Sequence, residues 1–510
     1  MQQEGNRWWT LAAVCVATFM LLLDITIVNV ALPDIARSLH SSFTDLQWVI
    51  DAYSLSLAAL LLTAGALADL LGRRRIFMIG LGLFSASSLL CALSSSPAML
   101  DAARALQGIG GAAMFATSLA LLAGAFHGRD RGTAFGIWGA TIGLSVAIGP
   151  LVGGLLTEKV AWQSIFYLNV PIGIGAIYVT LTRVAETRDP DAAGIDWAGL
   201  VTFSAGLFCL VYALVRGNAD GWTSGTILAC LVAAGVLLPG FVWVESRQRR
   251  PMFDLTLFRK PAFLGASLAA FALSASMFAM FLYLTLYIQN ALGYSPLQAG
   301  LRFLPTSLVS FVVAAVAGRL SARLPMRALV GAGLTLTGVG LLLMGGLNAD
   351  SGWTALLAGF VVAGAGVGMA NPTLASTAVG VVVPERAGMA AGIGNTFRQT
   401  GIATGIAALG AVFEHLAATK VVHAFAAAPA AVRARVAQVP SEVLATGSPK
   451  PFHAIPGGAH MYLAGFTGAL NTLFVISGAT ALAGAVLGFA LIRGRDFVAP
   501  PGAEGAPAAA

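Results

Sequence analysis

This chain contains few charged residues. Only 10% of its 510 residues are Asp, Glu, Lys or Arg, whereas 57% are hydrophobic. An ordinary soluble domain is about 25% charged, so the composition excludes a water-soluble globular fold. The net charge of +7 comes from single basic residues or short basic clusters between apolar runs, a pattern that gives no sign of nucleic-acid binding. The composition indicates a polytopic membrane protein.

Features that carry chemistry in many other proteins are also missing. The sequence has no Gly-Lys-Ser/Thr phosphate loop and no paired nucleophile and base, so we expect neither ATP as the energy source nor an enzyme, and no cofactor. Three histidines of the later chain lack metal-ligand spacing, so no metal is assigned: His423, His453 and His460. All four cysteines lie inside apolar runs, where we expect no disulfide: Cys15, Cys91, Cys209 and Cys230.

Long apolar runs are what the chain has in abundance. Crossing a bilayer takes about 20 mostly apolar residues, and backbone groups inside lipid must bond within the segment. Alternation with a period of two, typical of a membrane barrel, is absent. We therefore expect an all-α membrane protein with about fourteen transmembrane helices. Their approximate limits are 9–31, 46–70, 76–95, 97–124, 133–156, 164–183, 196–215, 223–244, 262–288, 298–320, 327–347, 353–380, 389–415 and 467–492.

The basic residues predict the orientation of these spans. If the N-terminus is cytoplasmic, most Lys and Arg fall in inner segments. The outer segments then hold only Arg37, Lys159, Arg216, Lys420, Arg433, Arg435 and Lys450, four of them in one long loop where the positive-inside rule has little force. We expect a multi-pass protein of the cytoplasmic membrane with both termini inside and residues 417–466 outside.

The spans are arranged as six, two and six. Residues 1–190 form an N-terminal six-helix bundle, 191–250 a two-helix insert, and 251–510 a C-terminal six-helix bundle with the long outer loop at 417–466. GALADLLGRRR (65–75), after the second span, has a faded counterpart in GRLSARLPMR (318–327). Parallel six-helix halves are a common transporter architecture, with the substrate path between the halves near mid-membrane.

Ionisable residues inside the spans are the best candidates for function, because each costs a few kcal/mol at mid-membrane. Asp24, Asp51 and Arg104 all lie roughly 8–10 Å below the outer surface at 1.5 Å per residue. An acid beside Arg stays ionised and an acid in apolar surroundings holds its proton, so movement between the two settings couples protonation to conformation. Solvation is the alternative for Asp51. Glu414, near the outer end of the thirteenth span, is a further proton-coupling candidate, with a solvated helix end as its alternative.

Several segments together resemble the fourteen-helix drug:proton antiporters of the major facilitator superfamily. LLLDITIVNVALPDI (21–35) resembles the first-helix motif of that family, and GALADLLGRRR its cytoplasmic loop motif. LDAARALQGIGGAA (100–113) is similar to the helix 4 motif centred on an arginine, and GIWGATIGLSVAIGPLVGG (136–154) to the antiporter motif of helix 5. WQSIFYLNVPIG (162–173), YSPLQAGLRFLP (294–305) and GMAAGIGNTFRQTG (388–401) match further family signatures, so the resemblance covers nearly the whole chain.

The resemblance assigns expected roles to two groups of residues. The loop motif implies a gate that latches the two halves, with fixing of the topology as its alternative role; its residues are Gly65, Asp69, Gly72, Arg73 and Arg74. The antiporter motif implies close helix packing that seals the halves against leakage, with ordinary bundle packing as the alternative; its residues are Gly136, Gly149, Pro150, Gly153 and Gly154.

The expected substrate path is apolar and aromatic. Its candidate lining residues, for which ordinary packing is the alternative, are Tyr53, Trp138, Met277, Tyr283 and Tyr287. Acids in such a path favour lipophilic cations. We therefore expect a monomeric, proton-coupled secondary transporter that exports small hydrophobic, cationic or amphiphilic drugs by alternating access. A dedicated exporter of one natural product or lipid is the alternative within transport; a membrane enzyme or receptor is the alternative of another class.

Overall fold

The computed structural model describes residues 2–126, 128–188, 194–248, 253–321, 323–382 and 387–497, and within these ranges every regular element is helical. The N-terminal half contains α1 (Gln2–Leu39), α2 (Phe43–Leu71), α3 (Arg73–Ala92), α4 (Pro97–Ala125), α5 (Gly128–Lys159), the short α6 (Ser164–Tyr167) and α7 (Asn169–Arg183). A hairpin of α8 (Trp197–Asp220) and α9 (Gly225–Arg247) follows. The all-α prediction is confirmed.

The C-terminal half begins after the short helix η1 (Leu255–Arg259). Its first span is continuous but mixed, with α10 (Pro261–Leu273), a π-helical turn η2 (Ser274–Phe278), α11 (Ala279–Leu286) and a second π-helical turn η3 (Tyr287–Ala291). The remaining spans are α12 (Pro296–Leu320), α13 (Met326–Leu343), α14 (Leu357–Gly380) preceded by η4 (Trp353–Leu356), α15 (Ala387–Ala424) and α18 (Gly458–Leu491), which is followed by η7 (Gly494–Asp496).

The number of spans agrees with the sequence. Thirteen described helices are long and apolar enough to cross a membrane, or up to fourteen when the bent α5 is counted as one span. That bend is 42°, between Gly136–Ser145 and Ile148–Lys159, and Pro150 lies just beyond it. Proline removes a backbone hydrogen bond and is a common cause of such bends.

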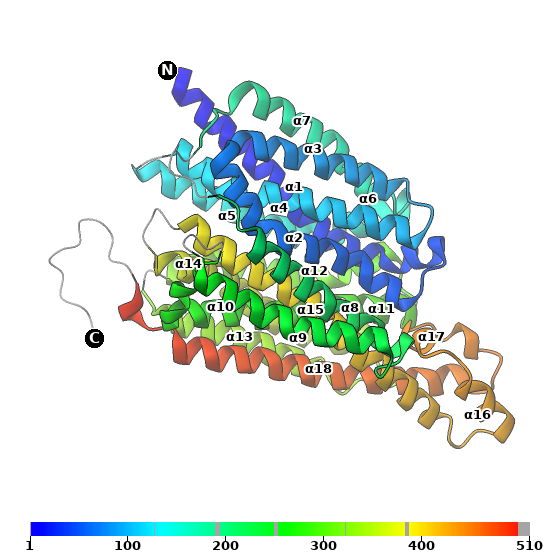
Figure 1. The fold of residues 1–510 in the computed structure, drawn as a ribbon. Helices are drawn as coiled ribbons and strands as arrows, with labels where there is room; N and C mark the ends of the chain where they lie inside the picture. The colour runs from blue at the N-terminus through cyan, green and yellow to red at the C-terminus, as the bar shows by residue number, and fades with distance from the viewer. Residues whose placement is uncertain are drawn as a thin grey trace.

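The two ends of the bundle are distinct (Figure 1). The start of α1 and the end of α18 lie at one end, which we call the terminal end, and α16 (Ala430–Ala437) and α17 (Ser441–Ala445) lie at the other, which we call the loop end. Two helices that start at the loop end have a capping box there: Ser42 and Asp45 form one on α2, and Ser295 and Gln298 form one on α12. Each box satisfies backbone donors that a helix start leaves free.

The long loop differs from its predicted limits. Helix α15 continues to Ala424 and α18 already begins at Gly458, so the segment between them is shorter than 417–466 and folds into α16, α17 and the short η6 (Lys450–Phe452). The helices extend past the apolar run because packing replaces lipid there: the Phe452 ring stacks on Tyr462 at 4.8 Å, and the Tyr462 hydroxyl donates to the Leu444 carbonyl at 2.9 Å. Hydropathy alone does not detect such a protruding helix.

The two halves meet most tightly at the loop end. On α5 and α12 the backbones nearly touch: a Cβ on Gly154 would lie 2.5 Å from the Pro296 carbonyl oxygen, and one on Gly300 would lie 2.3 Å from that of Pro150. Beside this contact the Glu158 carboxylate accepts hydrogen bonds from the Ser295 hydroxyl and, at 3.2 Å, from the Leu297 backbone N–H. Glu158 of one half therefore caps a helix of the other half.

Two further contacts complete this closure. Gln289 donates to the Val30 carbonyl at 2.6 Å, which ties η3 to α1, and Gln47 donates to the Ile406 carbonyl at 3.2 Å, which ties α2 to α15. Among the described residues, every hydrogen bond between the halves lies near the loop end. Toward the terminal end α2 and α15 stay close as far as Leu62 and Gly392. The structure is thus a state in which the loop end is closed.

Two glycines of helix α5 provide a matched test of the close approach. We predict that Gly154→Ala lowers the free energy of unfolding by about 1–3 kcal/mol, because its new Cβ collides with the α12 backbone. Gly136→Ala should leave stability unchanged or raised, because a Cβ there meets no atom within 4 Å and alanine favours the helix. Thermal unfolding of both purified variants in detergent measures this. Equal losses at both positions would contradict the packing described.

Candidate functional site

A buried ion pair lies at the centre of the N-terminal half. The Arg104 guanidinium on α4 donates from Nη1 to Asp24 Oδ2 on α1 at 2.5 Å, and both side chains are almost completely buried. Arg104 also donates from Nε to the Val49 carbonyl of α2 at 2.9 Å. The structure thus brings together two of the three ionisable residues that the sequence places at one depth, and links three helices through them.

Two amide side chains complete the surroundings of Asp24. Its Oδ1 accepts from Gln107 Nε2 at 2.9 Å and from Asn169 Nδ2 at 3.1 Å. The same two amides also donate to the Ser88 hydroxyl, at 2.7 and 3.2 Å, and Gln107 Oε1 accepts from Arg104 at 2.6 Å. Helices α1, α3, α4 and α7 therefore share one polar network. Sequence reasoning missed Ser88, Gln107 and Asn169, although an uncharged amide inside an apolar run is a usable signal.

Tyr53 closes this network on the α2 side. The Arg104 guanidinium lies 4.2 Å from the centre of the Tyr53 ring, within the range of a cation–π contact. The Tyr53 hydroxyl is buried without a hydrogen-bond partner among the described residues, near Gly111. Tyr53, predicted to line the substrate path, therefore borders the ion pair directly.

Asp51 lies apart from the ion pair. Its side chain is completely buried, and neither carboxyl oxygen has a hydrogen-bond partner among the described residues. Leu55, one helical turn further along α2, belongs to an apolar cluster with residues of α8 and α15. The Tyr283 hydroxyl on α11 lies within electrostatic range of Asp51 and donates to the Ile406 carbonyl at 2.8 Å. Asp51 therefore sits in the contact between the halves, and the alternative that it is simply solvated does not apply in this state.

Glu414 lies in the loop-end closure and is also buried. It accepts from the Ser441 hydroxyl at 2.6 Å and from Asn218 of α8 at 3.3 Å. Close by, Thr44 of α2 donates to Glu442 at 3.3 Å, which connects the loop to the N-terminal half. Burial, with the neighbouring Glu414 charge, raises the pKa of Glu442 above its usual range. The solvated helix end considered for Glu414 is therefore not what the structure shows.

The predicted gating loop makes its described contacts within its own half. Asp69 pairs with Arg73 at 2.9 Å, and Arg74 donates to the Leu181 carbonyl at 2.6 Å. Glu186, which sequence reasoning missed, accepts from the backbone N–H groups of Arg74 and Arg75 and so caps α3. Gly72 has φ +114°, a conformation that favours glycine. In this state the loop does not latch the halves through the described residues.

The glycines of the antiporter motif differ in their surroundings. Gly149 and Gly153 face α1, where an added Cβ would lie 1.9 Å from Thr26 Oγ1 and 2.8 Å from the Ile27 carbonyl. Gly154 faces α12, as described above, whereas a Cβ on Gly136 would meet no atom within 4 Å. The motif thus provides close helix approaches on two sides of α5, at its loop-end half.

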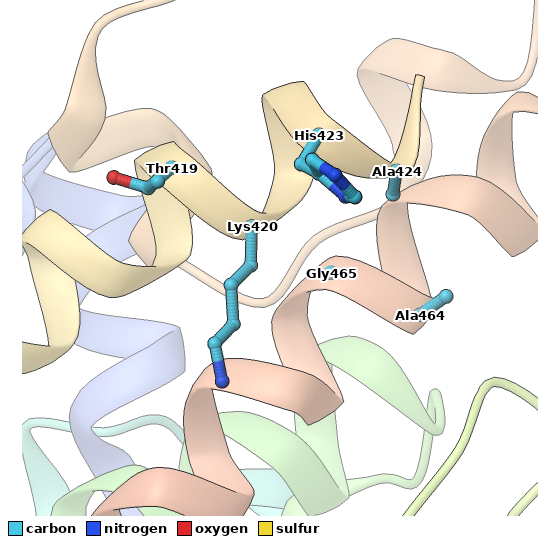
Figure 2. A pocket seen from close by; sticks show the side chains of 6 residues that line it. All are labelled: Thr419, Lys420, His423, Ala424, Ala464 and Gly465. Atoms are coloured by element: carbon cyan, nitrogen blue, oxygen red, sulfur yellow. The ribbon is translucent and has the colours of Figure 1, made fainter. Parts of the chain in front are cut away.

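Most predicted substrate-lining residues are packed in this state. Met277, Tyr283 and Tyr287 are buried, and the Tyr287 hydroxyl donates to the Ser351 carbonyl at 2.8 Å. Trp138 is partly exposed and donates to Thr18 at 2.9 Å. A surface hollow of about 450 Å³ lies elsewhere, between α15 and α18 at the loop end. Figure 2 shows Lys420 reaching from it toward α18, where its ammonium donates to the Gly468 carbonyl at 2.6 Å.

The fold and the buried network define the class of this protein. Two multi-helix halves meet across a closed end, and charged residues lie inside the membrane-spanning bundle, as in secondary transporters. Residues 14–406 match the family model described as Major Facilitator Superfamily. The chain belongs to the major facilitator superfamily, and it is a transporter rather than an enzyme.

Relatives and solved structures agree with this assignment. The chain is 39% identical over 430 residues to the multidrug resistance protein Stp of Mycobacterium tuberculosis, covering 84% of this chain and 80% of that protein. It is 33% identical over 491 residues to the tetracenomycin C resistance and export protein of Streptomyces glaucescens, covering 95% and 91%. A bacterial homologue of the human lysosomal transporter Spinster, solved inward-facing and occupied, matches with a TM-score of 0.63 at 16% identity over 97% and 99% of the two chains, which shows the fold.

A double-mutant cycle measures the strength of the buried pair. Asp24→Asn or Arg104→Gln alone should lower the free energy of unfolding by about 3–5 kcal/mol, because each leaves a buried group unpaired. The double variant should lose less than the sum of the two, with a coupling of about 0.5–3 kcal/mol. The partly exposed pair Asp69–Arg73 is the control and should couple by about 0.2–1 kcal/mol. Additive losses at Asp24 and Arg104 would show that the two do not interact.

Proposed function

We propose that this transporter exports hydrophobic, amphiphilic compounds across the cytoplasmic membrane in exchange for protons, by alternating access. The observation that supports the proposal is a contrast within one structure. Asp24 has a hydrogen-bond donor for each oxygen, whereas Asp51 is equally buried and has none among the described residues. Two acids in opposite settings are what coupling of protonation to conformation requires.

The setting of Asp24 suits its ionised form. One guanidinium and two amides donate to its oxygens, and charge-assisted hydrogen bonds of this kind offset the cost of burying the charge. Any loss of the negative charge would leave Arg104 as an unpaired cation inside the N-terminal half. Asp24 and Arg104 therefore act in the proposal as one neutral unit whose rearrangement accompanies a change of state.

The setting of Asp51 suits its neutral form. Placing an ionised carboxylate in apolar surroundings without a partner costs several kcal/mol, so this packing accommodates the protonated acid. The Tyr283 phenol from α11 lies near it, and α8 and α15 contribute apolar side chains around Leu55, one helical turn away. Separation of α2 from α15 would expose Asp51 and permit its ionisation. Protonation of Asp51 from the loop end therefore favours closure of that end.

This coupling gives the direction of transport. With the loop end outside, the more acidic external medium loads Asp51 and drives closure there, and loss of the proton on the cytoplasmic side completes the cycle. The short-loop Lys and Arg favour this orientation, with both termini in the cytoplasm. A monomer suffices, because both acids and both halves belong to one chain.

The substrate class follows from the interior and the relatives. The expected preference for cations depended on acids along the path, but Asp24 is neutralised by Arg104 and Asp51 is enclosed. We therefore propose amphiphilic compounds of the drug type, in line with similarity to multidrug resistance proteins. Export of one natural product is the second candidate, because the similarity to the tetracenomycin C exporter spans 95% of this chain.

Inverted membrane vesicles test the proposal. Uptake from a panel of lipophilic dyes of either charge should require an acidic lumen and collapse with a protonophore. Asp24→Asn and Asp51→Asn should each reduce gradient-driven uptake by about tenfold or more at matched protein levels, because each fixes one acid in a single state. Asp350→Asn is the control, since that acid is exposed at the loop end, and it should transport normally. Uptake that needs ATP and no gradient, or full uptake by both variants, would refute proton coupling.

A further inference from the structure

Helix α15 carries an arginine that the ion-pair network does not use. The antiparallel helices α2 and α15 touch at Gln47 and Ile406 near the loop end and at Leu62 and Gly392 further toward the terminal end. Arg398 lies midway along α15 between these two contacts. Since α2 spans the membrane over Phe43–Leu71, Arg398 is at the level of the middle of that helix.

The neighbours of Arg398 along α15 show which way its side chain faces. A Cβ on Gly401 would lie 2.6 Å from the Phe271 carbonyl oxygen of α10, and one on Gly405 would lie 2.6 Å from Ala275 of η2. A Cβ on Gly394 would lie 3.8 Å from Ala378 of α14. Residues three, four and seven apart share one helix face, so Arg398 faces the interior of the protein rather than lipid.

Arg398 is unlike the other cations held inside the bundle. Its side chain is partly exposed, and it makes no hydrogen bond, ion pair or ring contact with any other described residue. Arg104 is paired with Asp24, Lys420 donates to the Gly468 carbonyl, and Arg302 lies over the Tyr294 ring. An unpaired cation at mid-membrane costs about 2.5–3.5 kcal/mol on insertion scales, and such residues mark substrate or ion pathways.

Polar groups around Arg398 are also left without partners. Gln399 and Thr400 on the same helix each bury an oxygen that no described donor reaches, and so does Asn371 on α14. Asn371 lies two helical turns before Ala378 and shares its face, which is the face turned toward Gly394 of α15. Buried polar groups are ordinarily satisfied, so three unpartnered oxygens at the level of an unpaired cation indicate that a polar group binds in this part of the interior in another step of transport.

We propose that Arg398 binds an anionic oxygen group of the transported compound, a carboxylate or an ionised phenol, and so selects amphiphiles that carry an acidic group. The inference rests on the proposed export function and specifies its substrate class. Asp24 is neutralised by Arg104 and the packing of Asp51 suits its neutral form, whereas Arg398 has no anionic partner among the described residues. The planar guanidinium suits carboxylate recognition, because it donates two parallel hydrogen bonds that match the two carboxylate oxygens.

Equilibrium binding to the purified protein in detergent tests this without any proton gradient. The probes are two xanthene dyes of opposite charge, fluorescein methyl ester as the anion and rhodamine 6G as the cation, followed by fluorescence anisotropy. Arg398→Gln should weaken binding of the anionic dye about tenfold or more and leave the cationic dye bound as well or better. Arg398→Lys should stay within about threefold of the original for the anion, because the charge is kept.

Controls separate this role from a structural one. Arg302→Gln removes a cation at the loop end and should change neither affinity. An Arg398→Gln variant that binds both dyes more weakly to the same extent, or that binds the anion like the original protein, would overturn the inference. If the original protein binds the cationic dye but not the anionic one, the inference fails while amphiphile export stands. Binding of neither dye would count against both.

Discussion

Inside a membrane, every charged or hydrogen-bonding group must find its partner within the protein, and this constraint governs the whole structure. Asp24 and Arg104 meet it together, with Gln107, Asn169 and Ser88 satisfying the remaining donors and acceptors. The network joins α1, α3, α4 and α7, so it also fixes the helices of the N-terminal half relative to one another. Burying the ion pair costs desolvation free energy, and apolar packing can hold helices together without that cost. We therefore infer that the pair has a role beyond holding the helices together.

Asp51 is an exception to this constraint in the closed state, and in the proposed mechanism it links that state to an open one. It lies in the surface that α2 presents to the C-terminal half, so its carboxyl oxygens lack partners only while that surface is covered. The loop end is held closed by hydrogen bonds from Gln47 of α2 and from Gln289 to α1, and by the Glu158 carboxylate of α5 at the start of α12. Hydrogen bonds to water can replace each of these contacts when the loop end opens. In the proposed mechanism, protonation or ionisation of Asp51 shifts the balance between the closed and the open state.

The sequence predicts some features of this structure and not others. Apolar runs predict the helices because lipid imposes their length, and equal depth predicts that Asp24 can meet Arg104. The apolar runs do not predict the helix ends of α15 and α18, because these helices extend into packing among residues such as Tyr462 and Phe452, which hydropathy does not detect. Whether Asp51 faces water or the other half depends on the rotation of α2 against α15, which only tertiary packing sets. Glu186 was overlooked because a single acid in a polar linker carries no signal of its helix-capping role.

The most direct measurement of the central claim is the distance across the loop end as a function of pH. Spin labels on cysteines at Val160 of the α5–α6 connection and Leu301 of α12, both exposed beside the Glu158 contact, report whether that end is closed. In lipid nanodiscs without substrate, acidic pH should give the short distance and alkaline pH should add a longer one. Asp51→Asn should keep the short distance at every pH. A distance distribution that does not change with pH would contradict the account. So would an Asp51→Asn protein whose loop end opens at alkaline pH like that of the original protein.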